Sequence, residues 1–308
     1  MYSNQDLINK IKDLKKKKNA VILAHYYTNP EIQDIADFLG DSLGLSRQAA
    51  KTKADIIVFC GVNFMAETAS IISPDKKVLI PDINASCSLA KSINLAQLKQ
   101  WKKENPGSVV VTYVNTFADI KAESDYCCTS ANAAKIVGSI DKDKKILFLP
   151  DKNLGKFAKL KTNRNIKIWQ GTCHVHVEID DAIVNKAILK HPEADILIHP
   201  ECNVSIDFIK NHKNIFLYST AGMIKHAEQS SKKDFIIATE TGMIYALKKR
   251  FPCKNFYAVS ENAICEYMKY NNLKKVYNSL KNEEYEVKVE NSLAQKASKP
   301  IEKMLKIS

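Results

Sequence analysis

The segment Lys167-Ile168-Trp169-Gln170-Gly171-Thr172-Cys173-His174-Val175-His176 places a short apolar strand before a turn glycine, a thiol and two imidazoles. So many side chains that bind soft metals are unusual at the end of an ordinary strand. A similar unit of strand followed by cysteine occurs on each side of it, ending at Cys87 and at Cys265. The segment therefore raises the question of whether three thiols from distant parts of the chain meet.

The pattern of strands and helices around this segment repeats three times. Short apolar runs alternate with helical spacing, which is typical of parallel sheets covered by helices on both faces. The first strands of the repeats begin near residues 21, 109 and 195, and the cysteines stand at 87, 173 and 265. A period of roughly 90 residues indicates separate domains rather than a solenoid. We predict an α/β fold of three similar three-layer α/β/α domains, each with a short parallel sheet.

The domain boundaries follow from the same repeat. We predict domains over residues 1–90, 91–176 and 177–268. Residues 269–308 are predicted to form a helical extension that packs back on the first domain.

The composition of the chain limits its expected location and the kinds of ligand that it binds. The 308 residues include no apolar run long enough to span a bilayer and no secretory leader, so we expect a cytoplasmic protein. Its eight cysteines should then be reduced, and serve as core residues, metal ligands or nucleophiles. The net charge of +12 comes from scattered lysines without a nucleic-acid motif, and suits small anionic substrates better than nucleic acid. No glycine-rich nucleotide loop is present.

Polar side chains follow the predicted strands. Ligands of open parallel sheets bind beyond the carboxyl ends of the strands, so these side chains are candidate site residues. Those after the first strands are His25, Tyr27, Tyr113, Asn115, His199 and Glu201; those after the second strands are Ser42, Thr129, Ser130, Ser219 and Thr220. If the three domains face one axis, these groups and the three thiols share one pocket.

Three thiolates without a fourth suggest a metal centre with one open position. Zinc fits three cysteines, although its usual closely spaced pair is absent. A [4Fe–4S] cluster takes four ligands, so three cysteines leave one iron open to bind substrate oxygen as a Lewis acid. That chemistry suits dehydration or condensation.

The residues resemble the quinolinate synthase family over nearly the whole chain. The segments that carry the resemblance are Leu23–Tyr27, Gly40–Ser42, Gly61–Glu67, Pro81-Asp82, Cys87, Tyr113–Asn115, Cys128–Asn132, Pro150–Gly155, Trp169–His176, His199–Glu201, Ser219-Thr220, Thr239–Met243 and Cys265. The resemblance implies three domains around a pseudo-threefold axis and a [4Fe–4S] cluster at the bottom of a central cavity. It implies condensation of iminoaspartate with dihydroxyacetone phosphate to quinolinate, with release of phosphate and two waters, as part of NAD biosynthesis. An aspartate-oxidising enzyme would supply the iminoaspartate.

The resemblance also assigns roles by position. It implies that Cys87, Cys173 and Cys265 are the cluster ligands. It places His25, Tyr27, Tyr113, Asn115, His199 and Glu201 at the reacting centre, and Ser42, Ser130, Ser219 and Thr220 on carboxylate or phosphate. Within this set we expect Glu201 and His199 to be a proton-transfer pair tuned toward neutral pH. Tyr27 and Tyr113 are expected to donate hydrogen bonds to developing oxyanions.

Two other functions stay open. One is a hydro-lyase with a similar three-cysteine cluster that acts on another hydroxy acid, and the other is a zinc-stabilised binding protein. Because Cys265 completes the set of thiols, we expect His174 to be incidental and His176 to be structural or to support a ligand.

Overall fold

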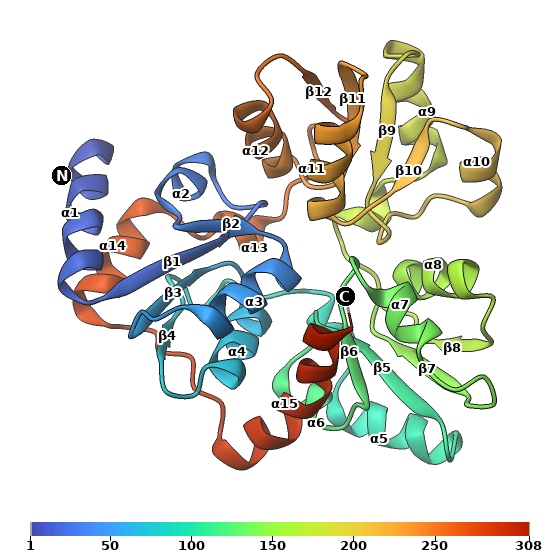
Figure 1. The fold of residues 1–308 in the computed structure, drawn as a ribbon, viewed down its shortest axis with the longest axis horizontal. Helices are drawn as coiled ribbons and strands as arrows, with labels where there is room; N and C mark the ends of the chain where they lie inside the picture. Colours follow the sequence, from blue (N-terminus) through green and yellow to red (C-terminus); the bar gives the residue numbers. More distant parts are fainter. Residues whose placement is uncertain (1, 308) are drawn as a thin grey trace.

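Three four-stranded parallel sheets form the framework of the chain (Figure 1). They are seen in a computed structural model that describes residues 2–307. In spatial order the first sheet consists of β2 (Phe38–Gly40), β1 (Ala20–His25), β3 (Ile56–Cys60) and β4 (Lys77–Leu79). The second consists of β6 (Tyr126–Cys128), β5 (Val109–Tyr113), β7 (Ile146–Leu149) and β8 (Ile166–Ile168). The third consists of β10 (Ile215–Leu217), β9 (Asp195–Ile198), β11 (Asp234–Ala238) and β12 (Asn255–Ala258).

Helices alternate with these strands in the same way in each unit. The first unit contains α1 (Asn4–Lys17), α2 (Pro30–Ile35), α3 (Ser42–Lys51) and α4 (Asn63–Ile72). The second contains η1 (Ala90–Ser92), α5 (Leu95–Glu104), α6 (Ala118–Ala122), α7 (Ala133–Gly138) and α8 (Lys152–Thr162). The third contains η2 (His176–Glu178), α9 (Asp181–Lys190), α10 (Ile206–Asn211), α11 (Thr220–Gln229) and α12 (Gly242–Arg250). The predicted α/β fold with three similar units is confirmed, and Figure 1 shows them as three lobes around a common centre.

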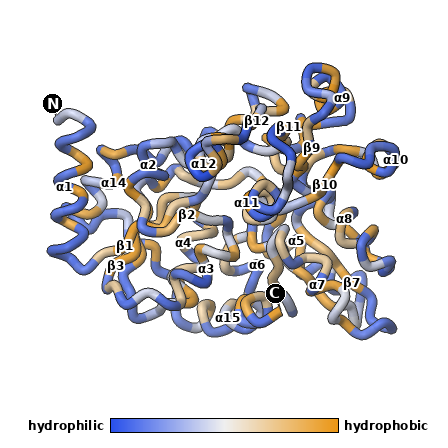
Figure 2. Tube along the Cα trace, turned by 45° about the horizontal axis from the view of Figure 1, so that its top comes forward, coloured by the Kyte–Doolittle hydropathy of each residue, from blue (hydrophilic) through white to orange (hydrophobic). Residues whose placement is uncertain are grey.

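The composition of the strands explains why the sheets are parallel and covered. Every residue of β3, β7 and β9 is buried, and these strands are rich in isoleucine, leucine and valine. Such continuous apolar strands need helices on both faces. Figure 2 shows hydrophobic residues concentrated along the strands, with hydrophilic residues on the peripheral helices.

The end of the chain binds to two of the units. Here α13 (Glu266–Lys269) leads into α14 (Leu273–Asn282), which packs on α1 and β3 of the first unit. An isolated antiparallel bridge from Glu286 to Leu79 then covers the free edge of β4. The last helix, α15 (Asn291–Lys306), lies against α4, α6 and β6. Its end is held by Asn132, whose side-chain amide donates to the carbonyls of Met304 and Ile307 at 3.0 and 2.9 Å.

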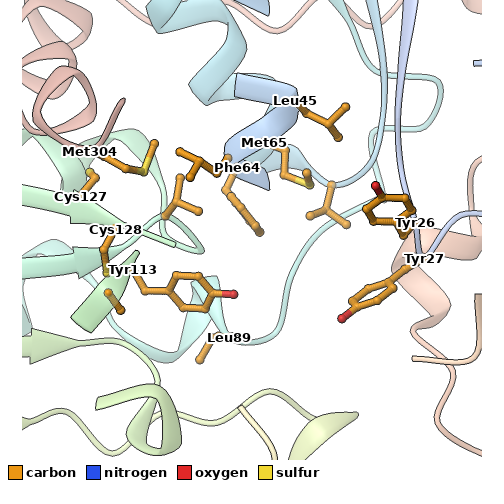
Figure 3. Packing of buried hydrophobic residues seen from close by; sticks show 14 of the residues in the cluster. Tyr26, Tyr27, Leu45, Phe64, Met65, Leu89, Tyr113, Cys127, Cys128 and Met304 are labelled. Carbon is orange, nitrogen blue, oxygen red and sulfur yellow. The ribbon is translucent and has the colours of Figure 1, made fainter. Parts of the chain in front are cut away.

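One apolar core extends through all three units. Phe64 and Met65 of α4 belong to the same cluster of buried side chains as Cys127, Cys128 and Met304 (Figure 3). The prediction that Cys60, Cys127 and Cys128 are core residues is confirmed, since all three are fully buried. Over residues 2–307, none of the helices has both the length and the apolar composition that crossing a membrane requires.

Candidate active site

The carboxyl ends of strands from all three sheets meet at one central cavity. The predicted site residues that line it are His25, Tyr27, Ser42, Cys87, Tyr113, Asn115, Thr129, Ser130, Cys173, His199, Glu201, Thr220 and Cys265. All three sheets share one strand order, so the carboxyl ends of equivalent strands supply the residues of the lining in each unit. Ser219 lies beside the cavity instead, where its hydroxyl accepts the Gly222 N–H at 3.2 Å and caps α11. In Figure 3 the hydroxyls of Tyr27 and Tyr113 point toward one another.

Two histidines occupy equivalent positions at the ends of β1 and β9. The Nδ1 atom of His25 accepts the main-chain N–H of Tyr27 at 3.2 Å, and Nδ1 of His199 accepts that of Glu201 at 3.4 Å. An Nδ1 atom that accepts a hydrogen bond carries no proton, so we assign the proton of both neutral rings to Nε2. Nε2 of His199 lies 3.1 Å from the Ser130 hydroxyl. Both imidazoles are therefore oriented by their own backbone as N–H donors.

Burial controls the charge of these histidines. It lowers the pKa of His25 to about 3, with His199 as a further cause. Burial likewise lowers the pKa of His199 to about 3. Both rings are therefore neutral at physiological pH, and they can donate hydrogen bonds to an anion without bringing a positive charge.

Glu201 is the anionic acceptor of the cavity. Burial acts to raise its pKa, but His176, His199 and the Tyr113 hydroxyl together lower it to about 2. Tyr113 donates its hydroxyl to Oε1 of Glu201, and burial beside this carboxylate raises the pKa of Tyr113 well above its usual value. Our expectation that Glu201 and His199 are tuned toward neutral pH is wrong. Both pKa values lie far below 7, because the carboxylate is surrounded by donors and the imidazole is fully desolvated.

A chain of hydrogen bonds joins Tyr27, Thr239 and His176, and no role was predicted for Thr239. The Tyr27 hydroxyl lies 2.5 Å from Oγ1 of Thr239, which lies 2.8 Å from Nε2 of His176. All three residues are buried. The signal for Thr239 was present, since it directly follows β11, at the carboxyl end of a strand of the third sheet.

His176 also contacts two groups that can bind metal. Its Nδ1 atom lies 3.2 Å from Sγ of Cys173 and 3.1 Å from Oε2 of Glu201. Ligand atoms of Cys173, His176 and Glu201 all lie within 4.8 Å of one another, so this group could hold a metal ion. His176 therefore contacts the predicted thiol ligand, the carboxylate and the Tyr27–Thr239 pair.

The three predicted thiol ligands share the cavity and affect one another. Burial raises the pKa of Cys87 to about 12, and Cys265 is a further cause. Burial raises the pKa of Cys265 to about 11, and that of Cys173 well above its usual value. All three are free cysteines. Three partly buried thiols that oppose one another's ionisation become thiolates together only when a cation joins them. The donor set therefore fits a metal centre.

Comparisons with known proteins agree over almost the whole chain. Residues 9–306 match the family described as Quinolinate synthetase A protein. The chain is 51% identical over 299 residues to a quinolinate synthase of Pyrobaculum aerophilum, covering 96% of this chain and 97% of the relative. The chain belongs to the quinolinate synthase family. It is also 47% identical over 302 residues to the quinolinate synthase of Methanosarcina barkeri, covering 98% of both. A Thermus thermophilus quinolinate synthase is 45% identical over 294 residues, covering 96% of this chain and 95% of the relative. The resemblance recognised in the sequence is confirmed.

An ion pair between a half-buried lysine and a buried carboxylate supports the third thiol of this member of the quinolinate synthase family. Glu240 is fully buried, and its Oε1 atom accepts the Cys265 N–H at 3.2 Å and pairs with Lys269 at 2.8 Å. Lys269 also donates to the carbonyl of Tyr27 at 2.7 Å. The loop that carries Cys265 is thereby tied to the end of β1.

Proposed function

We propose that the chain condenses iminoaspartate with dihydroxyacetone phosphate to quinolinate, releasing phosphate and two waters. The observation that carries this proposal is the convergence, in one cavity, of three thiols and two neutral imidazoles from the three units. The match to quinolinate synthases over nearly the full length of both chains supports the same activity. The product would feed NAD biosynthesis in the cytoplasm.

Cys87, Cys173 and Cys265 would hold a [4Fe–4S] cluster. Their position in three different loops, without a closely spaced pair, favours a group that is several atoms wide over a single zinc ion. When bound, an iron that lacks a protein ligand supplies a Lewis acid for a substrate oxygen. His176 is the alternative ligand near Cys173, but both of its nitrogens already have protein partners.

Neutral donors would bind the two anionic substrates. Nε2–H of His25 and of His199 can donate to carboxylate or phosphate oxygens, and both are fixed before the substrate arrives. The hydroxyls of Ser42, Ser130 and Thr220 add further donors in the same lining, while Ser219 supports them by capping α11. Oδ1 of Asn115 is buried and has no hydrogen-bond partner among residues 2–307, and it would accept from an amine or hydroxyl of the substrate.

Two phenols would move or hold protons. Tyr113 donates to Glu201, and its raised pKa keeps the proton on the phenol, so this residue would hold its proton and fix the carboxylate in place. Tyr27 can exchange its proton along the contact with Thr239 and His176. Glu201 would therefore act as the acceptor that orients Tyr113 and His176, with His199 beside it at 3.8 Å.

Product analysis tests the activity. Anaerobically purified protein is mixed with dihydroxyacetone phosphate and with iminoaspartate generated by an aspartate oxidase, the class of enzyme proposed to supply it. Quinolinate and phosphate are expected in equal amounts. A protein that dehydrates another hydroxy acid but forms no quinolinate would support the hydro-lyase.

Metal analysis tests the ligands. We expect iron and sulfide in the wild type and their loss from Cys87→Ala, Cys173→Ala and Cys265→Ala, with Cys253→Ala as an exposed control. A cluster retained in any of the three variants would contradict the three-ligand proposal. A colourless wild type that contains zinc alone would support the binding protein.

A further inference from the structure

Each loop that carries a cavity cysteine contributes a neighbouring residue to one small contact network. Ser88 follows Cys87, His174 follows Cys173, and Tyr267 lies two residues beyond Cys265. The Ser88 hydroxyl lies 2.7 Å from Nδ1 of His174. The His174 ring meets the Tyr267 ring edge-on, with 5.7 Å between centroids. The three loops are thus linked beside their thiols, and all three residues line the central cavity.

The Nε2 atom of His174 has no protein partner. It is buried, and none of the described residues forms a hydrogen bond with it. A buried polar atom without a partner is costly, and indicates a missing ligand or water. The ring belongs to the cavity lining and directly follows Cys173, so a group bound in the cavity can supply the missing partner.

Tyr267 also separates the cavity from the surface. A shallow outer depression is lined by Asn63, Ile83, Asn84, Ser86, Lys91, Phe117, Tyr267 and Tyr270. Only Ser86 and Tyr267 are common to the linings of this depression and the central cavity. The Tyr267 ring is therefore part of the wall between the thiols and solvent.

We propose that Ser88, His174 and Tyr267 form a clasp that closes the protein over its metal group, and that His174 donates its Nε2–H to a sulfur atom of that group. The inference rests on the proposed function, since it requires the cluster held by the three cysteines. We assign the Ser88 hydroxyl as the donor in its contact with Nδ1, and this assignment leaves the ring proton on Nε2. His174 is then a positioning residue, and hydrogen bonds to cluster sulfur atoms raise the reduction potential of a cluster. Tyr267 supplies only the wall.

The test separates these two roles in the anaerobically purified, full-length protein. His174→Phe keeps a ring beside Tyr267 but removes both nitrogens, and Ser88→Ala removes only the group that orients them. Tyr267→Ala opens the wall, while Tyr267→Phe keeps the ring and serves as the matched control. Iron and sulfide content, midpoint potential and the rate of iron transfer to a ferrous chelator are measured for each.

We expect all four variants to retain their cluster. His174→Phe should have a more negative midpoint potential and lose iron about tenfold faster. Ser88→Ala should also lower the midpoint potential and speed the loss of iron, but by smaller amounts. Tyr267→Ala should lose iron faster at an unchanged potential, and Tyr267→Phe should match the wild type.

Each failure has a separate meaning. Wild-type potential and iron release in both His174→Phe and Ser88→Ala would overturn the clasp while leaving the cluster in place. Should His174→Phe fail to fold, Ser88→Ala alone decides between the two outcomes. A wild type without iron, or a Cys173→Ala variant that retains it, would instead overturn the proposed function.

Discussion

The first and third units differ from the second at equivalent strand ends. His25 ends β1 and His199 follows β9, and each is oriented by a main-chain N–H two residues further along the chain. Tyr113 ends β5, and its hydroxyl is oriented by Glu201 of the third unit. The same topology thus supports donors that are fixed within one unit and a donor that is fixed only when two units meet. The repeated topology determines the position of a side chain in the fold, and the neighbouring groups determine how that side chain is oriented as a donor.

The largest expected effect concerns the acid sensitivity of the two histidines. An unfolded histidine takes up a proton near pH 6.5, whereas His25 and His199 stay neutral in the folded protein down to about pH 3. The unfolded state therefore binds more protons in this window, and stability falls as the pH drops from 6.5 toward 3. When the pH is lowered from 7.5 to 5, we expect the two rings together to reduce the free energy of unfolding by about 4 kcal/mol.

Urea unfolding of the metal-free protein at both pH values measures this effect. The double variant His25→Asn and His199→Asn should lose most of the difference, because asparagine retains an acceptor near Nδ1 but cannot titrate. The single variant Tyr113→Phe, which retains both imidazoles, should keep the wild-type difference in stability between the two pH values. Equal pH dependence in the double variant and the wild type would mean that the histidines are not desolvated as the structure indicates.

The next effect concerns catalysis by the equivalent imidazoles. His25→Asn and His199→Asn each remove the Nε2–H donor that we propose binds substrate anions. We expect kcat/KM for quinolinate formation to fall about 100-fold or more in each variant, as for loss of a donor from an oxyanion site. His25→Gln and His199→Gln restore an N–H near the position of Nε2, so they should recover part of the lost kcat/KM. If only one of the two substitutions lowers kcat/KM, the first and third units are not functionally equivalent.

Most of the architecture was accessible from the sequence, because parallel strands buried on both faces give continuous apolar runs. Their positions at strand ends predict His25, Tyr113 and Glu201 as candidate site residues, and the structure brings them to one cavity. The hydrogen-bond partners of these residues could not be predicted from the sequence. Thr239 follows a strand as the others do, but only the packing of the first unit on the third brings it to Tyr27. The charge of Glu201 also depends on donors from two units, so its environment could not be read from its neighbours in sequence.

A smaller effect would sharpen the contrast between donors fixed within a unit and donors fixed between units. Tyr113→Phe removes a hydrogen bond to a buried carboxylate, which we expect to destabilise the metal-free protein by about 1.5–3 kcal/mol. Tyr257→Phe removes a similar bond of 2.9 Å to Asp234 that lies near the surface within the third unit. That control should cost less than Tyr113→Phe, because water can replace the lost partner at the surface. Equal losses in the two variants, measured by urea unfolding, would show that contact between units adds nothing to the Tyr113 hydroxyl.

The smallest effect separates neighbouring hydroxyls at the start of α11. Ser219 caps this helix, whereas Thr220 lines the cavity. Ser219→Ala should therefore lower the free energy of unfolding by about 1 kcal/mol and leave KM nearly unchanged. Thr220→Ala should raise KM for a substrate by several-fold at little cost in stability, because its hydroxyl is a proposed contact rather than a cap. The reverse result, a raised KM with unaltered stability in Ser219→Ala, would return Ser219 to the substrate-binding role that the sequence predicted. It would also mean that the cap seen at α11 gives way to the substrate when the cavity is filled.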